Sequence, residues 1–237
     1  MKTVAWFSGG VSSAVAIKKI INEINEIIYI DIADQHPDTM RFLRDCEGWF
    51  GREIAIMQHP VYASIGQFIR KRRFINGPKG AACSKVLKVD LRVRWEFDQV
   101  EPLRYVWGMD AREENRADGL IRANPNQDHV FPLIDLGIGK TEAHEILNAS
   151  GITRPMMYDM GYHNNNCIGC VKGGMGYWNK IRVDFPEVFA DRAAMEREIG
   201  RSCINGTFLD ELDPDAGRHD PPITDECGLF CEYMRLS

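Results

Sequence analysis

The sequence lacks the long hydrophobic run that a membrane-spanning helix needs. Its longest apolar stretches, such as residues 27–32, fall far short of the roughly 20 residues that cross a bilayer. The N-terminal residues lead directly into a Ser-Gly-Gly sequence, which leaves no room for the apolar core and cleavage site of a secretory signal. We therefore expect a cytoplasmic protein with no membrane partner.

The sequence also lacks an excess of positive charge. Its formal net charge is −5, so no overall field attracts a nucleic acid, and the one basic run is residues 70–73. Its 44% of hydrophobic residues excludes a disordered chain, which would be poor in Ile, Leu, Val and Phe. The seven cysteines are an odd number, and without an export signal they argue against a disulfide framework. Clustered thiols in such a chain indicate metal binding or catalysis.

Several common site patterns are absent from the sequence. It has neither the Gly-Lys-Ser/Thr of a Walker loop nor Gly-x-Gly-x-x-Gly. Its six histidines form no metal-ligand spacing and no Ser-His-Asp arrangement. Only His36, beside the C-terminal end of the second expected strand, is well placed for a site.

Apolar segments typical of buried strands alternate with segments of helical periodicity. We expect strands over residues 3–7, 27–32, 53–58 and 103–107, and helices over 11–25, 38–50, 63–73 and 84–97. The alternation predicts an α/β fold, a Rossmann-like doubly wound and mostly parallel sheet, over residues 1–150. We expect residues 151–237 to form a small cysteine-bearing segment packed on the same site. Two further helices are expected, one over residues 141–149, just before this segment, and one over residues 185–201, within it.

A loop rich in glycine and serine follows the first expected strand. In a doubly wound sheet, the junction between a strand and the next helix is where phosphates bind. Glycines allow close approach of the backbone, hydroxyls donate hydrogen bonds, and the helix dipole favours an anion. The residues expected to hold phosphate or sulfate oxygens are Ser8, Gly9, Gly10, Ser12 and Ser13. The simpler interpretation is a tight glycine turn with serine caps.

This loop resembles the PP-loop of the adenine nucleotide alpha hydrolase superfamily. That group contains ATP pyrophosphatases, tRNA thiolation enzymes and the sulfonucleotide (PAPS/APS) reductases. The usual pattern is Ser-Gly-Gly-x-Asp-Ser, whereas this chain has Ser12 in place of the aspartate. In the ATP-cleaving members that acid is tied to magnesium and pyrophosphate. The serine at this position argues against an ATP pyrophosphatase but is compatible with nucleotide binding.

Further segments are similar to the reductase branch and occur in the same order along the chain. They are residues 29–39, 82–89, 108–116, 132–135, 155–170 and 226–230. The resemblance implies an adenine nucleotide ligand, with APS, PAPS and ATP left open. It places Asp31, Ala33 and Asp34 near the adenosine. It places Gly108, Arg112, Glu113 and Arg116 around the anionic end.

The cysteines of the second half have two possible roles. Cys167-x-x-Cys170 is a two-ligand chelate, and iron–sulfur members of the superfamily carry a Cys-Cys pair near the position of Cys83. The resemblance implies a [4Fe–4S] cluster on Cys83, Cys167 and Cys170, with one open iron or with Cys227 or Cys231 as a fourth ligand. Four thiolates would also suit a structural zinc. The alternative is that Cys167 and Cys170 are ordinary buried thiols.

Cys227 lies in a Glu-Cys-Gly-Leu sequence that resembles the C-terminal motif of the reductases. There the cysteine attacks the sulfur of the bound phosphosulfate, releasing AMP or its 3′-phosphate, and a separate thioredoxin-like thiol carrier then frees sulfite. Cationic neighbours lower the pKa of such a thiol. The candidate cations are Arg112, Arg116 and Lys172, with Lys85 and Lys88. Cys231 could be a resolving thiol, or both cysteines could be metal ligands.

Three functions are consistent with these residues. The resemblance favours a phosphoadenosine phosphosulfate or adenylyl sulfate reductase-like enzyme, an oxidoreductase of sulfur metabolism. The first alternative is ATP-dependent activation of a nucleic acid or nucleoside for sulfur insertion, as in tRNA thiolation or DNA phosphorothioation; only this alternative has a nucleic-acid partner. The second alternative is a non-catalytic protein that binds an adenine nucleotide.

Overall fold

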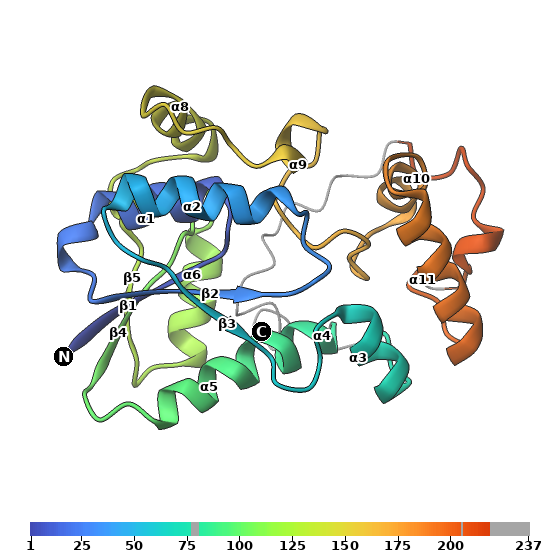
Figure 1. The fold of residues 1–237 in the computed structure, drawn as a ribbon, viewed down its shortest axis with the longest axis horizontal. Coiled ribbons are helices and arrows are strands. Elements are labelled where there is room, and N and C mark those ends of the chain that lie inside the picture. Colours follow the sequence, from blue (N-terminus) through green and yellow to red (C-terminus); the bar gives the residue numbers. More distant parts are fainter. Residues whose placement is uncertain (77–80, 205, 219–237) are drawn as a thin grey trace.

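A five-stranded parallel sheet forms the centre of the protein (Figure 1). The computed structural model describes residues 1–76, 81–204 and 206–218. The strands are β1 (Lys2–Phe7), β2 (Glu26–Asp31), β3 (Ala55–Gln58), β4 (Leu103–Val106) and β5 (Asp128–Val130). Their order is β3-β2-β1-β4-β5, and every neighbouring pair is parallel. The expected Rossmann-like sheet is confirmed, and the strand order reverses at β1.

Helices cover both faces of this sheet. The α-helices are α1 (Val11–Lys19), α2 (Asp38–Phe50), α3 (Ile65–Arg72), α4 (Ala82–Ser84), α5 (Asp90–Phe97), α6 (Glu114–Ala123), α7 (Pro132–Asp135), α8 (Lys140–Ala149), α9 (Met156–Asp159), α10 (Met175–Asp184) and α11 (Pro186–Ile199). Single turns of other helix types are η1 (Ile21–Glu23), η2 (Lys85–Val89) and η3 (Leu209–Glu211), of which η2 is a π-helix.

The alternation of side chains along β1 divides the core into two layers. Ala5 and Phe7 pack with α1, α2 and α8 on one face of the sheet. Val4 and Trp6 point to the opposite face, where α3 and α5 lie (Figure 1). This second layer continues to Trp178 on α10 and Met195 on α11. The later part of the chain therefore shares a hydrophobic core with the sheet.

Some elements differ from those that the sequence predicts. The short strand β5 was not expected, because its Asp-His-Val sequence has no apolar run and is partly exposed. The expected helix over residues 11–25 ends at Lys19, where Ile20 leaves the helical conformation with φ −125° and ψ 27°. Helix α6, and helix α10 in a stretch rich in glycine and aromatic residues, were also not expected.

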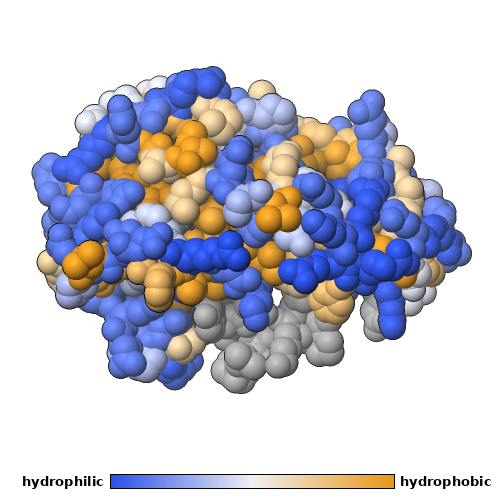
Figure 2. Space-filling model, turned by 60° about the horizontal axis from the view of Figure 1, so that its bottom comes forward, coloured by the Kyte–Doolittle hydropathy of each residue, from blue (hydrophilic) through white to orange (hydrophobic). Residues whose placement is uncertain are grey.

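The surface carries apolar side chains in separate groups. Figure 2 shows one face, on which patches of hydrophobic side chains are interrupted by hydrophilic ones. Over the described ranges, no helix combines the length and the apolar character needed to span a membrane.

Candidate functional site

The loop after β1 is a tight turn that opens helix α1. Gly9 has a φ of +77°, a conformation that glycine adopts without strain. The backbone N–H of Ser8 donates to Ser13 Oγ at 3.2 Å, and that of Gly10 donates to Ser8 Oγ at 3.2 Å. Within the described residues, the first turn of α1 has no acidic residue, and the only side chain that accepts one of its N–H groups is Tyr158, whose hydroxyl accepts the Val11 N–H at 3.3 Å. The positive end of its dipole is therefore available to an anion.

Gly108 brings the end of β4 into contact with this turn. A Cβ atom at Gly108 would lie 2.4 Å from Ser13 Cα, which is closer than real Cβ atoms come to any neighbour. Only glycine allows the loop after β4 to pass so close to α1. The contact lies between β1 and β4, next to the strand-order reversal where doubly wound sheets bind their ligands.

A cavity of about 710 Å³ opens beside this contact. We call it the switch-point cavity. Its polar lining comes from α1, from the loop between β4 and α6, and from α8, and includes Ser12, Asp110, Arg112, Glu113, Lys140 and His144. The structure thus brings together Ser12, Arg112 and Glu113, three of the residues expected to contact a nucleotide.

The basic groups of the switch-point cavity make it attractive to anions. Arg112 is exposed and forms no ion pair with the described residues, whereas Arg154 pairs with Asp159 at 2.7 Å. Burial, followed by the charges of Arg154 and Lys140, lowers the pKa of His144 to about 4. His144 is therefore neutral near pH 7.

Hydrogen bonds fix the loop between β4 and α6. Glu113 Oε1 pairs with Arg116 at 2.5 Å, and Glu113 Oε2 accepts the Asp110 N–H at 3.0 Å. Asp110 Oδ1 in turn accepts the Arg112 N–H at 2.9 Å. Glu113 and Arg116, both predicted site residues, therefore fix the conformation of the loop. The loop in turn fixes the backbone position of Arg112.

A smaller recess also borders the loop after β1. It is lined by Ser8, Gly10, Gln35, Lys88, Asn165, Asn166 and Cys167. Lys88 is only 7% exposed and lies in the π-helical turn η2, a helix type often found at functional sites. The recess therefore places a buried lysine and Cys167 beside Ser8 and Gly10. Asn165 Nδ2 donates to the Gly9 carbonyl at 2.9 Å and joins the two segments.

The predicted residues after β2 are engaged in contacts within the protein. Asp31 Oδ2 accepts a hydrogen bond from Gln58 at 2.7 Å, and the Ala33 N–H donates to Ala63 O at 2.9 Å. The Asp34 carboxylate pairs with the buried guanidinium of Arg192. Its backbone carbonyl accepts the Ile168 N–H at 2.7 Å. Asp34 thus joins the end of β2 to the segment that carries Cys167 and Cys170.

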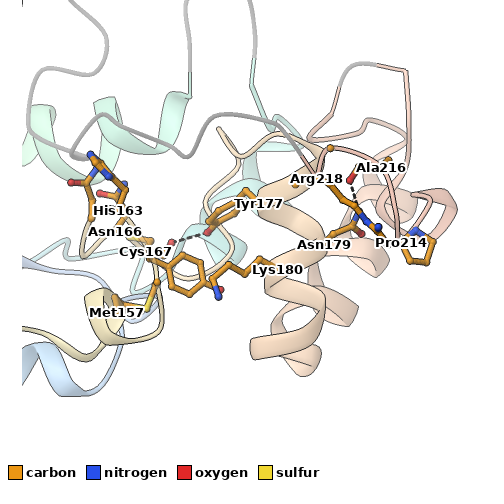
Figure 3. Close-up of a pocket in the computed structure, with 15 residues that line it drawn as sticks. Met157, His163, Asn166, Cys167, Tyr177, Asn179, Lys180, Pro214, Ala216 and Arg218 are labelled. Atoms are coloured by element: carbon orange, nitrogen blue, oxygen red, sulfur yellow. Dashed lines mark hydrogen bonds between the residues drawn. The ribbon is translucent and has the colours of Figure 1, made fainter.

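A second pocket, of about 240 Å³, lies between α10 and residues 161–167 (Figure 3). Tyr177 on α10 and Cys167 both line this pocket. The Tyr177 hydroxyl accepts the Cys170 N–H at 2.8 Å and donates to the Cys167 carbonyl at 3.3 Å. Burial raises the pKa of Tyr177 well above its usual value, so the hydroxyl stays protonated. Asn179 holds the carbonyl of Ala216 at 2.9 Å on the far side of the pocket.

The described cysteines do not by themselves fit a metal centre. Cys83, Cys167 and Cys170 are all buried. Nowhere in the described ranges do three His, Cys, Asp or Glu side chains come together in a way that could hold a metal ion. Cys227 and Cys231, the other predicted ligands, lie outside the described residues. An iron–sulfur cluster or zinc ion on these cysteines remains a prediction.

The remaining predicted site residue, Lys172, is half-buried in the loop between Cys170 and α10. The sequence did not single out Lys140, His144 or Arg154 as lining the cavity. No motif marks them, since two lie in an ordinary helix and one in a loop. The packing of α8 against α1 brings Lys140 and His144 to the switch point, and Arg154 lines the cavity from the loop between α8 and α9.

No protein-family model matches this chain, and no curated protein matches it. Among solved structures, the chain is similar to a crystal structure of phosphoadenylyl-sulfate (PAPS) reductase from Candida auris in complex with phosphate. The match has 14% sequence identity and a TM-score of 0.49, and it covers 68% of this chain and 79% of the other. Structural similarity at this low identity does not establish the activity of this chain.

Proposed function

We propose that this protein is a sulfonucleotide reductase-like enzyme that binds an adenylyl sulfate, APS or PAPS, at the carboxyl ends of β1 and β4. The observation that carries the proposal is the meeting of Ser12, Arg112 and Glu113 in one cavity at the switch point. These residues come from two segments far apart in the sequence, and each was expected at an anionic nucleotide. The position is where a doubly wound sheet binds its ligand.

We expect two kinds of group to bind the ligand: backbone N–H groups at the start of α1 and positively charged side chains. The first turn of α1 offers phosphate oxygens the dipole of the helix and the backbone N–H groups that follow Val11, whose own N–H donates to the Tyr158 hydroxyl. Arg112 adds a charge-assisted contact, and Arg116 acts through Glu113 by holding the loop. Lys88 does not line the switch-point cavity; we propose that it meets the sulfonate end of the ligand from the smaller recess, where it is buried beside Ser8 and Gly10.

Cys227 is the proposed nucleophile and lies outside the described residues. Its thiolate attacks the sulfur of the bound sulfonate, so that an S–S bond forms and the S–O bond to the phosphate breaks. The electron pair of that bond leaves with AMP or its 3′-phosphate. A thiol of a separate thioredoxin-like carrier then attacks Cys227, which releases sulfite and leaves a mixed disulfide that a second carrier thiol resolves.

The first test is intact-protein mass spectrometry after incubation with APS or PAPS in the absence of reductant. We expect one added SO₃ group per chain, and we expect it to be absent in Cys227→Ser. Addition of reduced thioredoxin to the wild-type adduct should release sulfite. Cys46→Ser is the matched control, because burial raises the pKa of this thiol and keeps it unreactive. Neither adduct nor sulfite from either nucleotide would contradict the proposal.

One observation favours the ATP-dependent alternative, in which a nucleic acid or nucleoside is activated for sulfur insertion. Asp110 places a buried carboxylate in the switch-point cavity, where an adenylyl sulfate alone brings no cation to it. A nucleotide that arrives with a divalent cation would satisfy it. Turnover of ATP that depends on added nucleic acid, without formation of the sulfo adduct, would support this second function.

A further inference from the structure

The pocket between α10 and residues 161–167 has aromatic walls. We call it the α10 pocket (Figure 3). Tyr162 and Tyr177 line it, and their rings meet edge to face with centroids 6.1 Å apart and planes at 74°. Met157 adds a thioether to the same lining. Aromatic faces and a polarisable sulfur are surfaces on which a planar ring packs well.

The size of the α10 pocket limits what it can hold. Its volume is about 240 Å³. This lies below the range of about 300–1,000 Å³ that is typical of sites for drug-sized ligands. The pocket therefore suits a single ring system better than a whole nucleotide.

The charged groups that line the α10 pocket are compensated within the protein. Lys180 pairs with Asp184 at 2.8 Å, and its ammonium lies 4.7 Å from the centre of the Tyr162 ring. Arg218 pairs with Asp215. Burial raises the pKa of both tyrosine hydroxyls of the pocket, so these groups stay protonated and neutral. The lining therefore favours an uncharged ligand over an anion.

Asn179 on α10 brings a buried acceptor to the same pocket. Its Nδ2 donates to the carbonyls of Asp213 at 2.8 Å and Ala216 at 2.9 Å. Only the amide NH₂ can serve two carbonyls, so this network fixes the orientation of the amide. The Oδ1 atom is buried and has no hydrogen-bond partner within the described ranges. A buried acceptor of this kind costs free energy until a donor reaches it.

A nucleobase with an amino group has all the properties that this lining selects. It is planar and uncharged near pH 7, it stacks on aromatic side chains, and it forms hydrogen bonds through its edge. We propose that the α10 pocket binds an amino-bearing nucleobase of a small molecule, whose amino group donates to Asn179 Oδ1. This second site goes beyond the proposed function and does not depend on it. Tyr162 and His163 line both this pocket and the switch-point cavity, so the two ligands would be neighbours.

The test is calorimetric titration of adenine, and of purine, which lacks the amino group, into the full chain. We expect adenine to bind the wild type about tenfold more tightly than purine, because only its amino group satisfies Asn179 Oδ1. Asn179→Ala should bring the two affinities close to each other. Any loosening of residues 213–216 in this variant affects both probes, so the ratio of the affinities still reports the lost hydrogen bond.

Asn148→Ala is the matched control for this titration. Asn148 is exposed on α8 and does not line the α10 pocket, so the variant should keep the tenfold preference for adenine. Equal binding of adenine and purine by the wild type, or an undiminished preference in Asn179→Ala, would overturn the proposal.

A second measurement locates the base without any change at Asn179. In protein labelled with 3-fluorotyrosine, adenine should shift the fluorine resonance of Tyr177, which lines the α10 pocket but not the switch-point cavity. Tyr158 lines the switch-point cavity but not the α10 pocket, and it reports binding there. Tyr177→Phe and Tyr158→Phe assign the two resonances. A shift of Tyr158 without a shift of Tyr177 would overturn the proposal.

Adenosine distinguishes the two sources of such a base. If adenosine binds at least as tightly as adenine, and the binding weakens equally in Asn179→Ala, the ligand is a nucleoside; if only adenine binds, the ligand is a free base. Cys227→Ser should lose the sulfo adduct and keep adenine binding. Failure of the reductase chemistry therefore leaves this inference intact, and absence of adenine binding overturns this inference alone.

Discussion

At the scale of single residues, Gly108 has the strictest steric requirement at the site. The Cβ atom of an alanine there would meet the backbone of Ser13 at 2.4 Å, so β4 and α1 would have to move apart. We expect Gly108→Ala to lower the free energy of unfolding by about 1–3 kcal/mol, the usual effect of overpacking, and to weaken nucleotide binding. Urea denaturation measures the first effect and calorimetry the second.

Gly119→Ala is the matched control. Gly119 lies within α6, and a Cβ atom there would have no neighbour within 4 Å. Alanine in a helix interior should raise the free energy of unfolding by about 0.5–1 kcal/mol. If Gly108→Ala behaved like this control, the close approach of β4 to α1 would be refuted.

His144 should make the stability of the protein depend on pH. Its pKa falls from 6.5 to about 4 on folding, chiefly through burial and then through the charges of Arg154 and Lys140. Between these two values the unfolded chain binds a proton that the folded protein rejects. We therefore expect the free energy of unfolding to decrease as the pH falls from about 6.5 to 4, by about 1–2 kcal/mol given the partial exposure of the ring.

Thermal or urea denaturation across this pH range, for the wild type and His144→Asn, measures the contribution of His144. As the pH falls from 8 to 4, the free energy of unfolding should decrease more in the wild type than in His144→Asn. Parallel pH profiles for the two proteins would show that His144 is not the group responsible.

The sequence predicted the part of the site that a local pattern encodes. Ser12, Arg112 and Glu113 stand in short motifs next to strand ends, and the structure places them in one cavity. Lys140, His144 and Arg154 stand in no motif and reach the cavity through tertiary packing. The contacts of Asp34 were equally unpredictable, because its partner Arg192 lies 158 positions later in the chain.

At the scale of elements, α11 is joined to the end of β2 by a buried ion pair. Arg192 on α11 and Asp34 have side chains that are 5% and 8% exposed. Removal of one partner of a buried pair leaves the other charge uncompensated. We expect Asp34→Asn to lower the free energy of unfolding by about 3 kcal/mol, toward the lower end of such effects because Asp191 also contacts Arg192.

Urea denaturation with Glu23→Gln as a control tests this prediction. Glu23 pairs with Arg104 at 3.4 Å but is 57% exposed, so its substitution should change the free energy of unfolding by less than about 1 kcal/mol. Equal effects of the two substitutions would mean that the Asp34–Arg192 pair does not hold α11 in place.

The sequence predicted the buried strands more readily than the exposed ones. Strands β1 and β2 are apolar on both faces and were recognised from their composition. Strand β5 is a three-residue edge strand with a polar sequence, and nothing local distinguishes it from a loop. Helix α10 contains Gly176 and aromatic residues that suggest a turn, yet Trp178 and Ile181 bury one side of it.

At the scale of the whole molecule, a chain of net charge −5 concentrates cations at one functional edge. The strand order places the switch point at that edge, and α1, α8 and the loop after β4 supply the groups around it. We therefore expect local electrostatics, rather than the overall charge, to govern the proposed anion binding.

The central claim is that the switch-point cavity binds the anionic groups of an adenine nucleotide. Calorimetric titration of AMP into the wild type, Arg112→Ala and Arg94→Ala tests it most directly, because Arg112 lines the cavity whereas Arg94 is an exposed arginine on α5. We predict that AMP binds the wild type and Arg94→Ala equally, and Arg112→Ala about tenfold more weakly. Absence of binding to the wild type, or equal affinity in all three proteins, would contradict the account.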